Sequence, residues 1–334
     1  MKRTGILLIN LGTPDSPSTA SVKKYLNEFL MDKRVIDLPY WIRLILVQGI
    51  IVPFRSKKSA HNYQTIWTEQ GSPLMVHTQE LTKKLQDHVG KHVKIAMGMR
   101  YGSPSIQQGL EDLKDCEKLI IFPLYPQYAS ATTGSSIEKV MAIFSQEQVI
   151  PSYAFIRDYF DHPAYIEALT LNLKNKVKKN HHLILSYHGL PERQLEAIGC
   201  RPVCQGSCSL DVIQVQGCYR QQCFINSHLL TQALGIEQPN YTVSFQSRLG
   251  KTPWIKPFTD ESLKHLYDKG IRKLQVACPS FVADCLETLE EIAITAKEQW
   301  FSLGGEAFEY LPCLNSEPEW IEAITKIIQH EITS

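Results

Sequence analysis

The stretch Leu183-Ile184-Leu185-Ser186-Tyr187-His188-Gly189-Leu190-Pro191-Glu192-Arg193 decides the fold of this chain. Its apolar start predicts a buried strand, and the glycine and proline that follow predict where the strand ends. His188 should therefore stand at the carboxyl end of a strand, where open α/β sheets bind their ligands. An imidazole there can bind a metal or move a proton near neutral pH, although a lone histidine is more often simply hydrogen-bonded within a turn.

Similar apolar runs recur along the chain and alternate with helical patterns, which predicts βαβ units and parallel sheets. We expect an α/β fold of two similar Rossmann-like domains, each a parallel sheet flanked by helices, with the active cleft between them. The first should span 1–150 and the second 151–314, with the last helix, 315–331, packed back on the first. Strands are expected at 5–11, 93–98, 118–123, 150–155, 182–187, 240–245, 272–277 and 307–311. Helices are expected at 18–31, 76–89, 104–115, 135–147, 162–179, 217–234, 260–269, 282–300 and 317–331.

The composition is that of an ordinary globular protein. The 334 residues are 43% hydrophobic and 21% charged, and the formal net charge is +1. Nucleic acid is an improbable partner, because phosphate binding calls for a basic excess. No signal peptide is recognisable, and we expect a cytoplasmic protein.

The segment 34–54 is unusually apolar. Polar residues and prolines interrupt it, so it falls short of the about 20 mostly apolar residues of a membrane span. It is either a buried helix or an exposed apolar lip that receives a flat hydrophobic ligand or touches the inner face of a membrane peripherally. Arg55, Lys57 and Lys58 follow directly and would suit carboxylates on such a ligand.

A second motif is Cys278-Pro-Ser-Phe-Val-Ala-Asp-Cys-Leu-Glu-Thr-Leu-Glu-Glu291. We expect a helix from about Val282, which would place Asp284, Glu287 and Glu291 along one stripe. An acidic first turn is common and often only solvated. With His188 at the same sheet edge, however, one imidazole and one carboxylate suit a transiently held divalent metal or a proton relay.

Cysteines form a third pattern. The chain has nine, and five of them lie between Cys200 and Cys223. Cytosolic thiols stay reduced, so such clustering favours metal or redox chemistry. The spacing C-x3-C-x3-C-x9-C within the segment 199–219 involves Cys200, Cys204, Cys208 and Cys218, and it is typical of a loop around a metal or cluster. Structural zinc and free thiols or disulfides are the alternatives.

Taken together, the motifs SYHGLPER, FPLYPQYASATTGSS, SFQSRLGKTPWIKPFTDESL, CPSFVADCLETLEEI and LLINLGTPDSP resemble those of the ferrochelatases, from residue 4 to about 330. This resemblance implies a chelatase-like fold and the insertion of substrate Fe²⁺ into protoporphyrin IX, the last step of haem synthesis. It implies that His188 accepts pyrrole protons, contacts iron, or both, and that Glu287 faces it. Asp284 and Glu291 would continue an acidic path for protons or iron. The residues that it implies for porphyrin contact are Leu11, Arg55, Lys58, Tyr63, Arg100, Tyr101, Tyr128, Ser130, Trp254 and Phe281.

The cysteine-rich insertion departs from ordinary bacterial relatives, and it is similar to that of some bacterial ferrochelatases with an internal [2Fe–2S] cluster. The ligands would be Cys200, Cys204, Cys208 and Cys218, with Cys223 as another candidate for the fourth and zinc as the rival occupant. Alternative functions are iron insertion into coproporphyrin III, a tetrapyrrole or metal carrier without turnover, and an iron–sulfur sensor. The sequence leaves the oligomeric state and the iron donor open.

Overall fold

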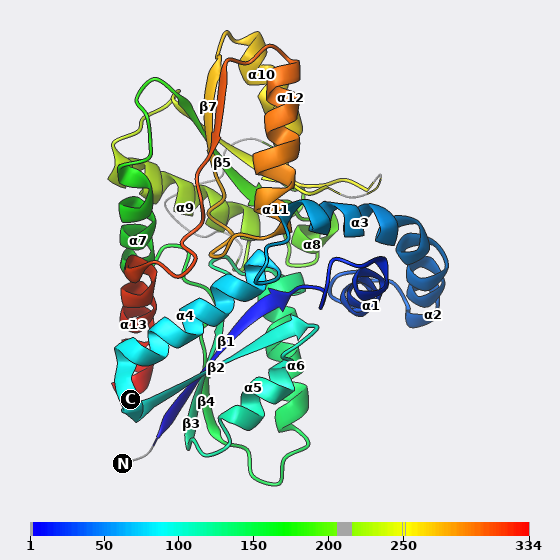
Figure 1. Cartoon of the computed structure of the whole chain (residues 1–334), viewed down its shortest axis with the longest axis vertical. Coiled ribbons are helices and arrows are strands. Elements are labelled where there is room, and N and C mark those ends of the chain that lie inside the picture. Colours follow the sequence, from blue (N-terminus) through cyan, green and yellow to red (C-terminus); the bar gives the residue numbers. More distant parts are fainter. Residues whose placement is uncertain (1–2, 206–215, 249, 251, 334) are drawn as a thin grey trace. The chain divides into compact units, whose positions relative to one another are not determined.

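The computed structural model describes residues 3–205, 216–248, 250 and 252–333. The chain divides into two compact units. One unit comprises Met1–Tyr125, Ala129–Arg157 and Ile328–Ser334, and the other comprises Pro126–Tyr128 and Asp158–Ile327. Figure 1 shows a sheet flanked by helices in each unit.

In the first unit, the described strands form a parallel sheet in the order β2-β1-β3-β4. Its central strand β1 is built from Ile6, Leu7, Leu8 and Ile9, which are completely buried. Burial of each such side chain contributes about 1.5–3 kcal/mol, so this run fixes β1 in the middle of the sheet. The strands are β1 (Thr4–Gly12), β2 (Val93–Tyr101), β3 (Lys118–Pro123) and β4 (Ser152–Phe155). The helices are α1 (Thr19–Leu30), α2 (Tyr40–Leu44), η1 (Ile45–Ile51), α3 (Val52–Ile66), α4 (Pro73–Val89), η2 (Gly90–His92), α5 (Ile106–Asp112), η3 (Ser130–Gly134) and α6 (Ser135–Phe144).

The second unit has the same topology, with a parallel sheet in the order β6-β5-β7-β8. Its central strand, β5, ends at His188 and pairs with β6 and β7. The strands are β5 (His182–His188), β6 (Tyr241–Gln246), β7 (Lys273–Ala277) and β8 (Ala307–Tyr310). The helices are α7 (Pro163–Lys174), α8 (Glu192–Glu196), α9 (Tyr219–Leu234), α10 (Thr259–Asp268), α11 (Leu286–Leu289), η4 (Glu291–Ala296), α12 (Lys297–Ser302) and α13 (Pro318–Thr333).

The predicted α/β fold of two similar parallel sheets is thus confirmed. Each of the predicted strands is present within a few residues of its expected bounds. The last helix, α13, contributes residues to both units: Trp320 packs on Tyr159 and Tyr165 of the second, while its final residues from Ile328 belong to the first. No helix among the described residues is both long enough and apolar enough to cross a membrane.

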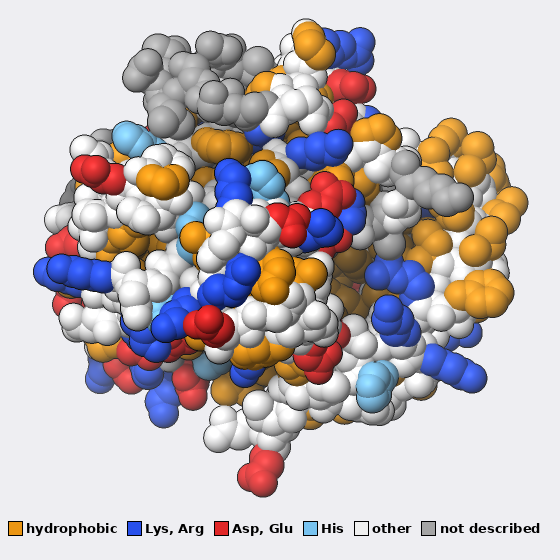
Figure 2. Space-filling view, turned by 90° about the horizontal axis from the view of Figure 1, so that it is seen from above, with side chains coloured by type: hydrophobic (Ala, Val, Ile, Leu, Met, Phe, Trp, Pro, Cys, Tyr) orange, Lys and Arg blue, Asp and Glu red, His pale blue; other side chains and the backbone are white. Residues whose placement is uncertain are grey.

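The apolar segment 34–54 is helical from Tyr40 onward, through α2, η1 and the start of α3, and several of its apolar side chains are exposed. Val47 and Val52 are buried and pack with Leu30 of α1. In contrast, Trp41 is 71% exposed and Phe54 is 80% exposed. The segment is therefore the exposed apolar lip rather than the buried helix, and Figure 2 shows hydrophobic side chains gathered at the right-hand side of that view.

Candidate active site

His188 occupies the last position of β5 and is partly buried. Its Nδ1 lies 2.6 Å from the carbonyl oxygen of Gly189. Because a carbonyl oxygen can only accept a hydrogen bond, Nδ1 must carry the proton in the neutral ring. The lone pair therefore belongs to Nε2, which is the atom that can take up a proton or bind a metal.

The turn after His188 is held tightly. The backbone N–H of His188 donates to Ser280 Oγ at 3.2 Å, and that of Gly189 donates to the Gln246 carbonyl at 2.8 Å. A methyl group on Gly189 would come 2.8 Å from that carbonyl oxygen and 3.3 Å from the Trp254 ring, so only glycine fits. The Phe281 ring lies 6.3 Å from the imidazole, centroid to centroid. Two predicted porphyrin contacts thus border the histidine.

The carboxylate of Glu291 interacts electrostatically with the imidazole of His188. Its Oε1 accepts from the Ser247 N–H at 2.7 Å, and its Oε2 accepts from the Ser247 hydroxyl at 2.5 Å. Burial raises the pKa of Glu291, and the negative charge of Glu287 raises it further, while hydrogen bonds from Ser247 and the charge of His188 oppose this. Glu291 therefore interacts electrostatically with both His188 and Glu287. As a buried carboxylate, it also takes up a proton more readily than a solvated carboxylate does.

Glu287 lies on α11 and Glu291 begins the π-helix η4, so the two are four residues apart along a continuous helical segment. A π-helical turn inside a helix is frequent at functional sites. The backbone carbonyl of Glu287 accepts from Gln246 Nε2 at 2.7 Å, which ties this helix to the end of β6. The Cys285 thiol hydrogen-bonds the Glu287 side chain.

The expected start of this helix at Val282 is wrong, because α11 begins at Leu286 with Cys285 as its N-cap. Asp284 therefore precedes the helix and does not share the helical stripe of Glu287 and Glu291. It is 6% exposed, and its carboxylate accepts hydrogen bonds from the Tyr310 hydroxyl and from Asn315 Nδ2. Helix α11 starts later than expected because Cys285 is its N-cap. The residues before it form a turn in which Asp284 is hydrogen-bonded to Tyr310 and Asn315.

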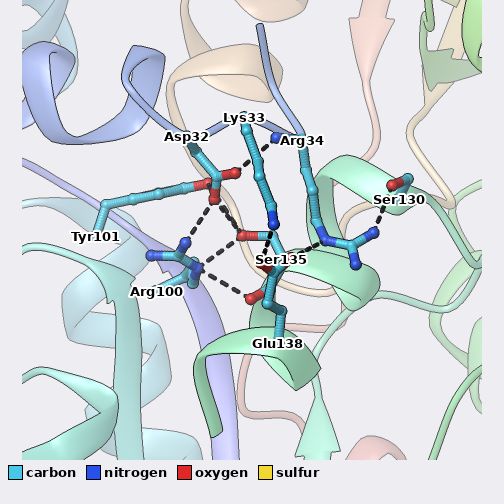
Figure 3. A network of polar contacts seen from close by, with 8 residues as sticks. All are labelled: Asp32, Lys33, Arg34, Arg100, Tyr101, Ser130, Ser135 and Glu138. Atoms are coloured by element: carbon cyan, nitrogen blue, oxygen red, sulfur yellow. Dashed lines mark hydrogen bonds and ion pairs between the residues drawn. The ribbon is translucent and has the colours of Figure 1, made fainter. Parts of the chain in front are cut away.

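In the first unit, Asp32 is the centre of a buried polar network (Figure 3). Its Oδ2 accepts from Arg100 Nη2 at 2.5 Å, from the Tyr101 hydroxyl at 2.8 Å and from the Ser135 hydroxyl at 2.5 Å. Burial alone would raise the pKa of Asp32, but hydrogen bonds from Ser135, from the Arg34 N–H and from Tyr101, together with the Arg100 charge, hold it below its usual value. The network fixes the side chains at the end of β2.

Arg34 extends this network. Its Nη1 donates to the Ser130 hydroxyl at 2.9 Å, and its Nε is paired with Glu138, which also binds Lys33. Asp32, Lys33 and Arg34, which follow α1, thus bind the first residues of η3 and α6 through hydrogen bonds and ion pairs. Sequence reasoning missed Asp32; a charged run directly after an amphipathic helix was the available signal.

The other predicted porphyrin contacts differ in accessibility. Tyr101 and Tyr63 are buried, and the Tyr101 hydroxyl is engaged by Asp32. Leu11, at the end of β1, is partly exposed. Arg55 and Lys58 are exposed on α3.

Cys200, Cys204 and Cys218 lie near one another, whereas Cys208 lies outside the described residues. Burial raises the pKa of the Cys218 thiol, and the charges of Cys200 and Cys204 raise it further. Arg220 Nη1 donates to Cys204 Sγ at 3.4 Å. Among the residues that the structure describes, no three His, Cys, Asp or Glu side chains are arranged to hold a metal ion.

Comparison with known proteins gives a consistent result. The ferrochelatase family model matches residues 3–332. A ferrochelatase of Legionella pneumophila (strain Paris) is 54% identical over 330 residues, covering 99% of this chain and all of the relative. One of Coxiella burnetii (strain CbuK_Q154) is 44% identical over 337 residues, covering 99% of this chain and 94% of the relative.

Among solved structures, SirB from Bacillus subtilis with Fe³⁺ has a TM-score of 0.56 at 11% identity, covering 98% of this chain and 95% of that one, which is a likeness of fold alone. The sequence matches extend over nearly the whole chain, and they agree with the observed fold. The chain belongs to the ferrochelatase family.

Proposed function

We propose that this chain inserts Fe²⁺ into protoporphyrin IX, with His188 and Glu287 as its catalytic groups. Its family consists of metal-insertion lyases that act in haem synthesis. The observation that carries the assignment of His188 is the contact of its Nδ1 with the Gly189 carbonyl, which leaves the Nε2 lone pair to act as a base.

Insertion requires the porphyrin to lose two protons. The two pyrrole N–H groups each release a proton as their nitrogens bind Fe²⁺, and the product has no added charge. Nε2 of His188 accepts a pyrrole proton, and Glu291, whose pKa burial raises, passes it onward. Glu287 opposes the imidazole and either holds the incoming iron or accepts the second pyrrole proton, and Asp284 would extend the acidic path.

Porphyrin contacts are proposed for residues of both units. Phe281 and Trp254 supply ring surface beside His188. Arg100, held by Asp32, and Ser130, held by Arg34, supply polar groups for the propionates. The remaining proposed contacts are Leu11, Arg55, Lys58, Tyr63, Tyr101 and Tyr128.

A [2Fe–2S] cluster is proposed for the cysteine-rich segment. The support for it is the sequence spacing of Cys200, Cys204, Cys208 and Cys218, since a [2Fe–2S] cluster takes four thiolate ligands; the three of these cysteines that the structure describes are not arranged to hold a metal ion by themselves. When bound, such a cluster can exchange one electron or cross-link the loop. Metal content and the visible spectrum of purified protein distinguish iron and sulfide from zinc.

Peripheral contact with a membrane is proposed for the lip. Trp41, Ile45 and Phe54 are 71%, 68% and 80% exposed. The exposed cations Arg55 and Lys58 follow on the same helical segment and would meet anionic headgroups.

The decisive test is an anaerobic assay with Fe²⁺ and protoporphyrin IX, combined with porphyrin titration by fluorescence. His188→Ala should lower insertion at least about a hundredfold, the range of general-base catalysis, and keep porphyrin affinity within about threefold. His182→Gln is the matched control, because His182 lies on the same strand but hydrogen-bonds Thr242. Equal loss of insertion and binding in His188→Ala would refute the catalytic assignment. Faster turnover of coproporphyrin III would identify that substrate instead, and binding without turnover in the unaltered protein would indicate a carrier.

A further inference from the structure

The first turn of α9 is connected to the backbone of His188. The helix begins at Tyr219, directly after Cys218, its N-cap. Tyr219 is buried, and its hydroxyl hydrogen-bonds the side chains of Ser280 and Cys223. The Ser280 hydroxyl in turn accepts from the backbone N–H of His188 at 3.2 Å. Two consecutive hydrogen bonds thus lead from the residue after Cys218 to the proposed catalytic histidine.

The same turn of α9 also holds Tyr128. The side-chain carbonyl of Gln222, which is completely buried, accepts from the Tyr128 N–H at 2.7 Å. On the other side, the Tyr128 ring faces Gly217, where an added methyl group would lie 3.5 Å from the ring. A residue proposed to contact the porphyrin is therefore fixed by the segment that contains Cys218.

A third connection runs from this turn to the cysteines. Arg220 is completely buried, and it donates to Cys204 Sγ through Nη1 and to the Lys256 carbonyl through Nε at 3.2 Å. The first turn of α9 thus touches the cysteine-rich segment through Arg220 and the N-cap, and the proposed chelation site through Tyr219 and Gln222. Side chains that are this buried and hydrogen-bonded have little freedom to move independently.

We propose that Tyr219 and Gln222 are positioning residues, Tyr219 for His188 and Gln222 for Tyr128, and that through them the contacts of Cys204 and Cys218 with the first turn of α9 influence the geometry of the chelation site. This inference rests on the proposed function, because the positioning roles concern the proposed chelation site. Neither residue touches the reacting atoms. Tyr219 acts through Ser280 on the placement of the imidazole, and Gln222 acts on the placement of a ring that faces the porphyrin.

Two substitutions separate these roles by their kinetics. Tyr219→Phe removes one hydroxyl and keeps the ring, so kcat should fall about fivefold while KM and porphyrin affinity stay within about twofold. Gln222→Met removes the acceptor at similar volume, so porphyrin affinity should weaken about fivefold with kcat nearly unchanged. Tyr187→Phe is the matched control. Its buried hydroxyl binds Asn226 and Ser227 of the same helix but not Ser280, so it should lose similar stability and keep kcat.

The coupling to the cysteines is tested with Cys204→Ser, alone and combined with Tyr219→Phe, on the full chain. The readouts are porphyrin affinity, the absorption band of the bound porphyrin, and kcat. If Tyr219 transmits the effect, Cys204→Ser should change the band and kcat in the unaltered chain and change them much less in the Tyr219→Phe background. Independent, multiplicative effects would overturn the proposal, as would a loss of kcat in Tyr187→Phe equal to that in Tyr219→Phe. If the unaltered protein makes no haem, the proposed function fails, but the absorption band still decides the coupling.

Discussion

Replacing Asp32 with asparagine should destabilise the first unit strongly. The Asp32 side chain is 5% exposed and that of its partner Arg100 is 17% exposed. Removing one partner of a buried ion pair costs about 3–5 kcal/mol, because the other charge stays buried. Arg100 keeps the hydroxyl and carbonyl of Ser135 as acceptors, so we expect the lower end, about 3 kcal/mol. That corresponds to a fall of about 6–12 °C in the midpoint of thermal unfolding.

Urea unfolding followed by circular dichroism measures this loss directly. Glu138→Gln is the matched control, an isosteric change in the same network. The Glu138 side chain is 37% exposed, and its partners Lys33 and Arg34 are 66% and 33% exposed, so the loss should stay below about 1 kcal/mol. Equal losses in the two variants would refute the idea that burial of the Asp32 charge makes the network stabilising.

Three further outcomes are expected. The folded-state pKa of Asp32 is lowered, so its contribution to stability is present above its unfolded pKa near 4 and is lost as the pH falls through the folded value. In acid titrations of unfolding, the difference in unfolding free energy between the unaltered protein and Asp32→Asn should therefore shrink below about pH 4. Gly12→Ala should cost more than about 2 kcal/mol in urea unfolding, since φ is 110° and the new Cβ would lie 1.8 Å from the Tyr101 carbonyl oxygen, whereas Gly49→Ala, with open space around it, should cost almost nothing. Trp41→Ser combined with Phe54→Ser should weaken sedimentation with anionic vesicles about tenfold or more at unchanged stability, and unchanged sedimentation would contradict membrane contact through the lip.

The sheets could be predicted because parallel strands are buried on both faces and appear as continuous apolar runs. Ile6 to Ile9 and Leu183 to Leu185 are examples, and both became central strands. Helix details were harder. The π-helical turns at Ile45–Ile51 and Glu291–Ala296 have no distinct periodicity in a sequence, and the late start of α11 depends on a Cys285 cap rather than on a standard capping residue.

The strand-end position of His188 was predictable and the structure confirms it, whereas the residues that support it were not predictable; the catalytic roles of His188 and Glu287 stay predictions. His188 follows from its place at a strand end, and Glu287 follows from the family resemblance. The partners that hold such groups, Ser280 for His188 and Asp32 for Arg100, lie 92 and 68 residues away along the chain. Such contacts depend on how loops meet at the sheet edge, which local patterns do not encode. For the same reason the burial of Tyr101 against Asp32 could not be foreseen.

The carbonyl that selects the tautomer of His188 belongs to the main chain, and this has an evolutionary consequence. Where a carboxylate orients a histidine, one substitution elsewhere in the gene removes the orienting group. Here the acceptor is a backbone carbonyl, so no side-chain replacement can remove it. The group that orients His188 is therefore retained whatever amino acids the chain carries. The vulnerable position is Gly189 itself, because any larger residue would meet the Gln246 carbonyl at 2.8 Å and displace the turn. The acceptor itself therefore survives any substitution, and within this turn Gly189 is the position at which replacement should be least tolerated.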